Sequence, residues 1–182
     1  VGYTNAGKST LFKALTGTDV YIQDQLFATL DTTIRKLSLD SSHTILLSDT
    51  VGFIRKLPHN LVASFKSTLK EVLEADLILM VLDISSPQIS EHITTIFDVL
   101  KEMSANKIPI VKVLNKVDLI SNGKLIQKLQ QSFPDSVTIS AKNHLRLSDL
   151  KQKIITMMES NYETVDLKFT YDDGKTIAQV QE

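Results

Sequence analysis

A short stretch near the start of the chain, GYTNAGKS at residues 2–9, combines glycines, a lysine and a serine at a spacing suited to phosphate. Gly2 and Gly7 let backbone N–H groups approach phosphate oxygens, and a following helix would add the partial positive charge of its N-terminus. Lys8 is placed to reach the β- and γ-phosphates, and the Ser9 hydroxyl to bind Mg²⁺. The alternative is an ordinary glycine-containing turn before a helix.

A second motif, DTVG at residues 49–52, follows an apolar segment. Asp49 can hold Mg²⁺ through a water molecule, because carboxylate oxygen is a ligand type that this cation prefers. The Gly52 N–H can face a γ-phosphate bound at the first motif. The first two motifs therefore complement each other around one triphosphate.

Two motifs further along the chain are suited to a guanine base. NKVD occupies residues 115–118, where the Asp118 carboxylate can accept from both N1–H and N2–H of guanine, a donor pair that adenine lacks. A site built around such bonds rejects the wrong base, because its carboxylate would be left unpaired. SAK follows at residues 140–142, where the Ala141 N–H can donate to guanine O6. Four motifs in this order predict a guanine-nucleotide site.

The elements that must position these motifs can be read from the hydropathy pattern. Residues 76–83 and 108–115 are continuous apolar runs, typical of strands covered on both faces, and residues 136–140 form a shorter one. Residues 35–39 and 44–49 flank the turn DSSH and predict a hairpin. Each chemical motif after the first begins at, or directly follows, the end of one of these strands.

Segments with helical periodicity alternate with the strands. We expect helices at residues 8–15, 58–73, 90–107, 123–133 and 147–160, the first ending at Gly17 as a C-cap. Such alternation predicts an α/β fold with a doubly wound, mostly parallel sheet. Ligands of doubly wound folds bind at the carboxyl edge of the sheet, where these motifs gather. We expect one domain over residues 1–161 and the truncated start of a small C-terminal extension over residues 162–182.

The amino-acid composition excludes several classes of protein. The 182 residues include 20 Lys and Arg against 21 Asp and Glu, so bulk charge does not indicate nucleic-acid binding. Cysteine is absent, which excludes disulfide scaffolding and thiolate metal sites. The apolar runs are shorter than the roughly 20 residues that span a bilayer. We expect a soluble, cytoplasmic monomer.

The chain resembles the translation-factor-related GTPases of the Obg/HflX kind, and most closely the HflX family, with a Ras-like P-loop fold. The stretches that carry the resemblance are GYTNAGKSTLF, LFATLDTTIR, LLSDTVGFIRKLP, STLKEVLEADLILMVLD, NKVD and SAK. The similarity covers residues 1 to roughly 160. By this resemblance Thr29 is the switch threonine that completes the Mg²⁺ shell, with Thr32 and Thr33 as nearby competitors. Thr32 stands where members usually have proline, which would loosen the switch loop.

The predicted site residues share a place in these motifs. Catalytic roles are expected for Lys8, Thr29, Gly52 and Asn5, and metal binding for Ser9, Thr29 and, through water, Asp49. The nucleotide-binding set comprises Gly2, Tyr3, Thr4, Asn5, Ala6, Gly7, Lys8, Ser9, Thr10, Phe27, Ala28, Thr29, Leu30, Asp31, Asp49, Thr50, Val51, Gly52, Asn115, Lys116, Val117, Asp118, Ser140, Ala141 and Lys142.

One catalytic group is missing. Many Ras-like enzymes carry a water-orienting glutamine after the DxxG glycine, where this chain has Phe53, so we expect slow intrinsic hydrolysis. Asn5 resembles the asparagine of cation-dependent GTPases, in which K⁺ lies beside the phosphates. The alternative is that Asn5 only closes the loop turn, and both readings stay open.

The resemblance also implies a partner. HflX-family proteins act on the large ribosomal subunit and split stalled ribosomes under stress, and the ribosome would complete the catalytic site. Four basic residues near the second switch could touch rRNA phosphates or form a solvated helix face: Arg55, Lys56, Lys66 and Lys70.

We therefore expect a Mg²⁺-dependent GTPase that converts GTP to GDP and phosphate. The alternative from another class is a nucleotide-gated binding module of the Obg/Era kind with negligible hydrolysis. An ATPase would require adenine where NKVD favours guanine.

A single residue, Val1, precedes the phosphate motif. In a Ras-like fold the strand before this motif is central, between the strands that end at Asp49 and Asp83. We therefore expect an N-terminally truncated chain whose first strand is missing, and weak GTP binding or instability through the gap.

Overall fold

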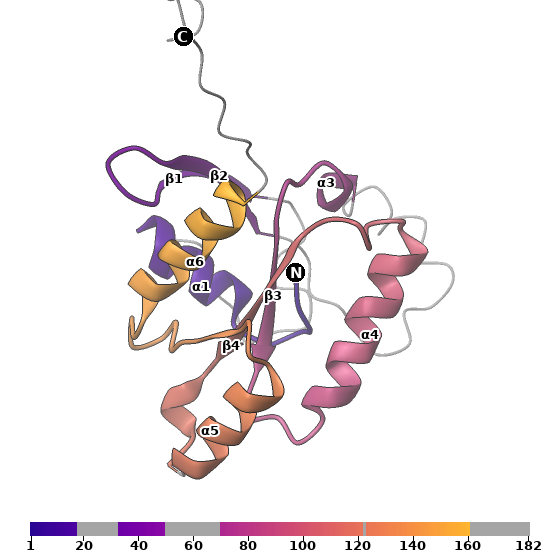
Figure 1. The fold of residues 1–182 in the computed structure, drawn as a ribbon, viewed down its shortest axis with the longest axis vertical. Helices are drawn as coiled ribbons and strands as arrows, with labels where there is room; N and C mark the ends of the chain where they lie inside the picture. Colours follow the sequence, from indigo (N-terminus) through magenta and orange to yellow (C-terminus); the bar gives the residue numbers. More distant parts are fainter. Residues whose placement is uncertain (18–32, 50–69, 122, 161–182) are drawn as a thin grey trace, which may run out of the picture.

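The structure is a computed structural model that describes residues 1–17, 33–49, 70–121 and 123–160 (Figure 1). Its strands are β1 (Thr33–Ser38), β2 (Thr44–Asp49), β3 (Ile78–Asp83), β4 (Ile110–Asn115) and β5 (Val137–Thr138). Its helices are α1 (Lys8–Thr16), α3 (Lys70–Leu73), α4 (Ile89–Glu102), α5 (Gly123–Ser132) and α6 (Leu147–Glu159), with a 3₁₀ turn η1 (Val117–Leu119). Strands and helices alternate from β3 onward, as predicted.

The described strands form two sheets. β1 and β2 make an antiparallel hairpin, whereas β3, β4 and β5 are parallel in that order. Asp83 and Asn115, the last residues of β3 and β4, are partners in register. Because the two strands end level, the loops that follow them leave the sheet at the same edge, which is the edge that carries the chemical motifs.

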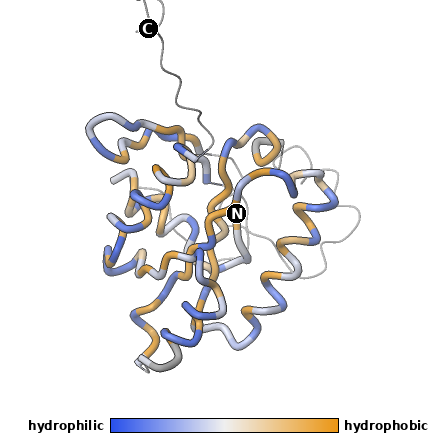
Figure 2. The backbone as a smooth tube through the Cα atoms, in the orientation of Figure 1, coloured by the Kyte–Doolittle hydropathy of each residue, from blue (hydrophilic) through white to orange (hydrophobic). Residues whose placement is uncertain are grey.

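The parallel sheet is covered on both faces, with α1 and α6 on one side and α4 on the other (Figure 1). Alternate residues of β3 serve the two cores: Val81 packs with the α1 and α6 side chains, and Met80 with those of α4. Both side chains are buried, as expected for a parallel strand covered on both faces. Apolar residues accordingly follow the central strands in Figure 2. Within the described ranges, no helix is long and apolar enough to cross a membrane.

Most predicted boundaries differ from the observed ones by about two residues, the usual uncertainty of helix and strand ends. The end of α4 is the exception, because the helix predicted for residues 90–107 stops at Glu102. Ser104 adopts a left-handed conformation with φ 62°, and Ala105 N–H donates to Leu100 O at 2.8 Å. This is a Schellman ending, which usually has glycine where Ser104 stands, so the usual stop signal is absent from the sequence. Of the helix predicted from residue 58, the described part is α3.

The first residues of the chain run alongside β3. Val1 N donates to Leu79 O and Val81 N donates to Val1 O, each at 2.8 Å, and Gly2 forms a parallel bridge with Val81. A Cβ at Gly2 would collide with the Val81 carbonyl oxygen, so glycine is needed for this approach. On the β3 side, Val1 therefore lies where we expected the strand before the phosphate motif.

Candidate nucleotide-binding site

The phosphate loop, residues 2–9, leads from the edge of β3 into α1. Gly7 is the N-cap of α1 with φ 92°, and Asn5 is also left-handed with φ 59°. Ala6 N donates to Tyr3 O at 3.2 Å, which closes a turn inside the loop. A Cβ at Gly7 would collide with the side-chain nitrogen of Asn115. Both the left-handed backbone conformation and the lack of space therefore favour glycine at this position. The loop thus directs backbone N–H groups and a helix N-terminus toward one site.

Lys8 begins α1 and folds back over the loop. Its Nζ donates to Tyr3 O at 3.1 Å. Burial lowers the pKa of Lys8 from 10.5 to about 8, and the nearby Asp49 carboxylate opposes the shift. An incoming phosphate would favour the protonated amine and take over its hydrogen bonds, which is the role that the spacing predicted.

Ser9 and Asp49 meet across the loop. Ser9 Oγ donates to Asp49 Oδ2 at 2.7 Å, and Asp49 is 3% exposed at the end of β2. In the part of the chain that the structure describes, no group of three or more His, Cys, Asp or Glu residues could hold a metal. One hydroxyl and one carboxylate nevertheless suit Mg²⁺, which usually takes one or two protein oxygens and completes its shell with phosphate and water. The donor set therefore fits this ion.

Asn115, at the end of β4, joins two of the predicted motifs. Its Nδ2 donates to Ala6 O in the phosphate loop at 2.9 Å, and its Oδ1 accepts from Ala141 N at 3.0 Å. Asn115 and Ala141 are each 2% exposed. The Asn115 amide, the Ala6 carbonyl and the Ala141 N–H therefore form their hydrogen bonds away from water. Because buried polar groups need such partners, the amide fixes the distance between the phosphate end and the base end of the site.

The guanine end of the site follows β4 and β5. Asp118 is exposed in η1, and Val117 N donates to Ile139 O at 3.1 Å, which ties this turn to the strand beside it. The Ala141 N–H, predicted to donate to guanine O6, is already held by Asn115. A guanine O6 would therefore share this donor.

Two contacts in the site were not predicted from the sequence. Lys116 Nζ lies 2.7 Å from Asp83 Oδ2, so the lysine of NKVD is paired with the end of β3. Burial acts to raise the pKa of Asp83, but hydrogen bonds from Lys116 and Ser85 outweigh it and lower this pKa overall. Tyr3 in the phosphate loop stacks on His92 of α4, with ring centroids 3.9 Å apart. Asp83 was detectable as an acidic end to a buried strand, whereas no sequence signal links Tyr3 with His92.

Several of the predicted residues lie outside the described part of the chain. They are Phe27, Ala28, Thr29, Leu30, Asp31, Thr50, Val51 and Gly52, together with Phe53 and the basic residues Arg55, Lys56 and Lys66. Thr32, the departure from the usual proline, lies there as well.

The fold and the loops at its carboxyl edge define a Ras-like P-loop domain. A family described as 50S ribosome-binding GTPase matches residues 1–116, and the chain belongs to this family.

Curated relatives narrow the assignment. GTPase HflX of Caldanaerobacter subterraneus subsp. tengcongensis is 46% identical over 182 residues, covering 100% of this chain and 41% of the relative. GTPase HflX of Escherichia coli (strain K12) is 40% identical over 176 residues, covering 96% of this chain and 41% of the relative. The resemblance to the HflX family is thus confirmed. The chain spans about two fifths of the length of these relatives.

Solved structures confirm the fold class. A GTP-binding protein from Sulfolobus solfataricus in complex with GDP has a TM-score of 0.70 and 30% identity, covering 88% of this chain and 51% of that one. Era in complex with MgGDPNP and nucleotides 1506–1542 of 16S ribosomal RNA has a TM-score of 0.66 and 25% identity, covering 94% of this chain and 58% of that one.

The bridge made by Asn115 leads to a prediction about stability. Asn115→Ala leaves the Ala6 carbonyl and the Ala141 N–H without their partner, which we expect to lower the free energy of unfolding by about 2–5 kcal/mol. Urea titration of the nucleotide-free chain measures this loss. Asn143→Ala is the matched control, because Asn143 is exposed and its hydrogen bond to Ser140 uses the backbone N–H that alanine keeps. Equal losses in the two variants would rule out a structural bridge.

Proposed function

We propose that the chain binds GTP with Mg²⁺ and hydrolyses it to GDP and phosphate by direct attack of water. The observation that carries this proposal is the bridge through Asn115, which holds a phosphate-binding loop and a guanine-type loop at a fixed spacing. We assign this unit to residues 1–161, with residues 162–182 as the beginning of a C-terminal extension.

The residues at the phosphate end have separable tasks. Lys8 would leave Tyr3 O and place its ammonium against the β- and γ-phosphate oxygens, where charge develops during transfer. The N-terminus of α1 and the loop N–H groups would hold the same oxygens. Ser9 would hold Mg²⁺ directly, Asp49 through a water, and Thr29 would complete the shell; bound Mg²⁺ neutralises the phosphate charge.

The base end would select guanine. Asp118 is exposed where a ligand can reach it, and Lys116 beside it is held by Asp83. Two donors from guanine satisfy the Asp118 carboxylate, whereas adenine would desolvate it without replacing those bonds.

Asp118→Ala tests this selection. We expect the chain to prefer GTP over ATP by a factor of about 10² or more, and the variant to lose most of this preference. Competition of GTP and ATP against a fluorescent GDP analogue measures it. Asp135→Ala removes a carboxylate from an exposed side chain outside the site and is the matched control. A variant that keeps the full guanine preference would exclude Asp118 from base recognition.

We further propose that hydrolysis is slow until the site is completed. Phe53 cannot orient water, so another group must do so. One candidate is K⁺ held by Asn5, whose left-handed φ of 59° is equally compatible with a purely structural role in the loop. The other is the large ribosomal subunit, which the family description and the likeness to HflX proteins support. In this proposal the protein works in the cytoplasm and splits stalled ribosomes, with the basic residues near the second switch contacting rRNA.

Turnover measurements separate these possibilities. We expect phosphate release by the 182-residue chain to be slow in Na⁺ and to rise at least tenfold in K⁺ or with purified large ribosomal subunits; for scale, completion of the site by a partner yields about 10⁵-fold in Ras. Asn5→Ala, with GDP affinity checked in parallel, should abolish a K⁺ response. Equal turnover in Na⁺ and K⁺, with and without subunits, would contradict the proposal. Tight GDP binding with negligible turnover throughout would favour the nucleotide-gated binding module instead.

A further inference from the structure

The ring of Tyr3 in the phosphate loop lies flat against the ring of His92 in α4. The ring centroids are 3.9 Å apart and the ring planes differ by 11°. Both residues are half-buried, and Tyr3 also packs against the core that includes Ile96 and Leu100 of α4. Stacked aromatic rings stabilise a structure beyond the area that they bury. The contact therefore ties the start of the phosphate loop to a helix on one face of the sheet.

His92 lies in the first turn of α4, and this turn is fastened to the segment that follows β3. Ile89 N donates to Ser86 O at 3.3 Å, and Gln88 N donates to Ser86 Oγ at 3.2 Å. His92 N in turn donates to Gln88 O at 3.0 Å. Ile96, four residues later, is fully buried, and residues at this spacing share one face of a helix. The ring of His92 is therefore presented to the loop from an anchored helix.

The backbone of Tyr3 organises the rest of the phosphate loop. Its carbonyl oxygen accepts from Ala6 N at 3.2 Å and from Lys8 Nζ at 3.1 Å. One oxygen thus closes the turn of the loop and also holds the lysine that we assign to the phosphates. A shift of Tyr3 would move both of these groups.

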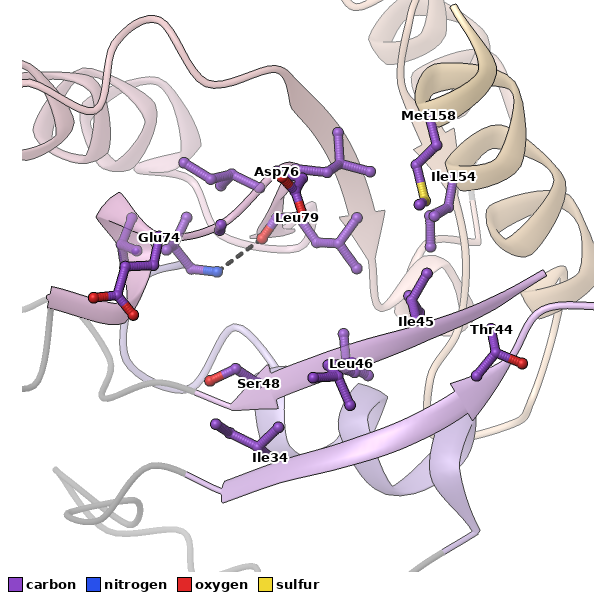
Figure 3. Close-up of a pocket in the computed structure, with 16 residues that line it drawn as sticks. Ile34, Thr44, Ile45, Leu46, Ser48, Glu74, Asp76, Leu79, Ile154 and Met158 are labelled. Atoms are coloured by element: carbon purple, nitrogen blue, oxygen red, sulfur yellow. Dashed lines mark hydrogen bonds between the residues drawn. The ribbon is translucent and has the colours of Figure 1, made fainter. Parts of the chain in front are cut away.

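The loop is also anchored on either side of Tyr3. Before it, Val1 N donates to Leu79 O of β3 at 2.8 Å, the bond drawn as a dashed line in Figure 3. After it, Ala6 O accepts from Asn115 Nδ2 at the end of β4 at 2.9 Å. The stack on His92 adds a third anchor between these two, and it is the one that involves α4.

We propose that His92 is a positioning residue for the nucleotide site, because its stack on Tyr3 fixes the phosphate loop in shape before a nucleotide arrives. This inference rests on the proposed binding of GTP and GDP. A loop that is already ordered loses less conformational entropy when its ligand binds, so the stack raises the affinity for nucleotide. His92 acts on the loop through Tyr3 and is not itself assigned to the phosphates, so GTP and GDP should gain affinity alike.

Substitutions of His92 test the role of its ring. His92→Leu keeps a side chain of similar size but removes the ring, whereas His92→Phe keeps a planar ring. We expect His92→Leu to weaken binding of a fluorescent GDP analogue by a factor of about three to ten, the range that corresponds to one lost aromatic pair, and His92→Phe to stay within about twofold of the parent chain. Asp98→Ala, an exposed change on the same helix, is the matched control and should leave the affinity unchanged.

A double-mutant cycle shows whether the effect passes through Tyr3. Tyr3→Leu and His92→Leu should each weaken GDP binding, and the double variant should bind no more weakly than Tyr3→Leu alone, because either change removes the same contact. The proposal is overturned if His92→Phe binds as weakly as His92→Leu, or if the two losses multiply in the double variant.

Hydrogen exchange without nucleotide keeps this result separate from the proposed function. The amide of Ala6, which donates to Tyr3 O, should exchange about three- to tenfold faster in the His92→Leu chain, while the buried Val113 amide in β4 keeps its rate. Equal acceleration of both amides would indicate a loss of global stability and would contradict a positioning role. If the parent chain bound no GDP, the proposed function would fail, and the exchange comparison would still decide whether His92 shapes the loop.

Discussion

The amide of Asn115 is the interaction on which the site depends. It reaches the phosphate loop through Ala6 and the loop after β5 through Ala141, and it occupies the space that a side chain at Gly7 would need. One short side chain can do this only because three loops leave the sheet at the same edge. The geometry of the site is therefore a property of strand register more than of any single loop.

That register is held by burial. β3 sends alternate side chains into two separate cores, so a slip of one residue would move apolar groups from one core to the other and shift Asp83 away from Asn115. The ion pair between Asp83 and Lys116 spans the same two strand ends. The packing that sets the register of the strands therefore also sets the positions of the polar side chains at their ends.

Much of this arrangement was predictable because its signals are local. Continuous apolar runs predicted β3 and β4, and Gly17 predicted the end of α1, where it adopts φ 68°. The order of the motifs predicted the class of ligand. In these cases a run of apolar residues, or a glycine with its greater backbone freedom, is enough to predict the local structure.

Other features could not be predicted because they depend on pairs of residues brought together by the fold. The stack of Tyr3 on His92 and the pair between Lys116 and Asp83 each join separate elements. Ser104 ends α4 in a conformation that glycine usually adopts, so the position had no signature.

The buried position of Lys8 has a consequence for how a ligand is received. Its pKa of about 8 means that part of the lysine population is neutral in slightly alkaline solution. A phosphate arriving at the loop favours the charged form, so binding draws a proton from the solvent. The heat of nucleotide binding then includes the ionisation heat of whichever buffer supplies that proton.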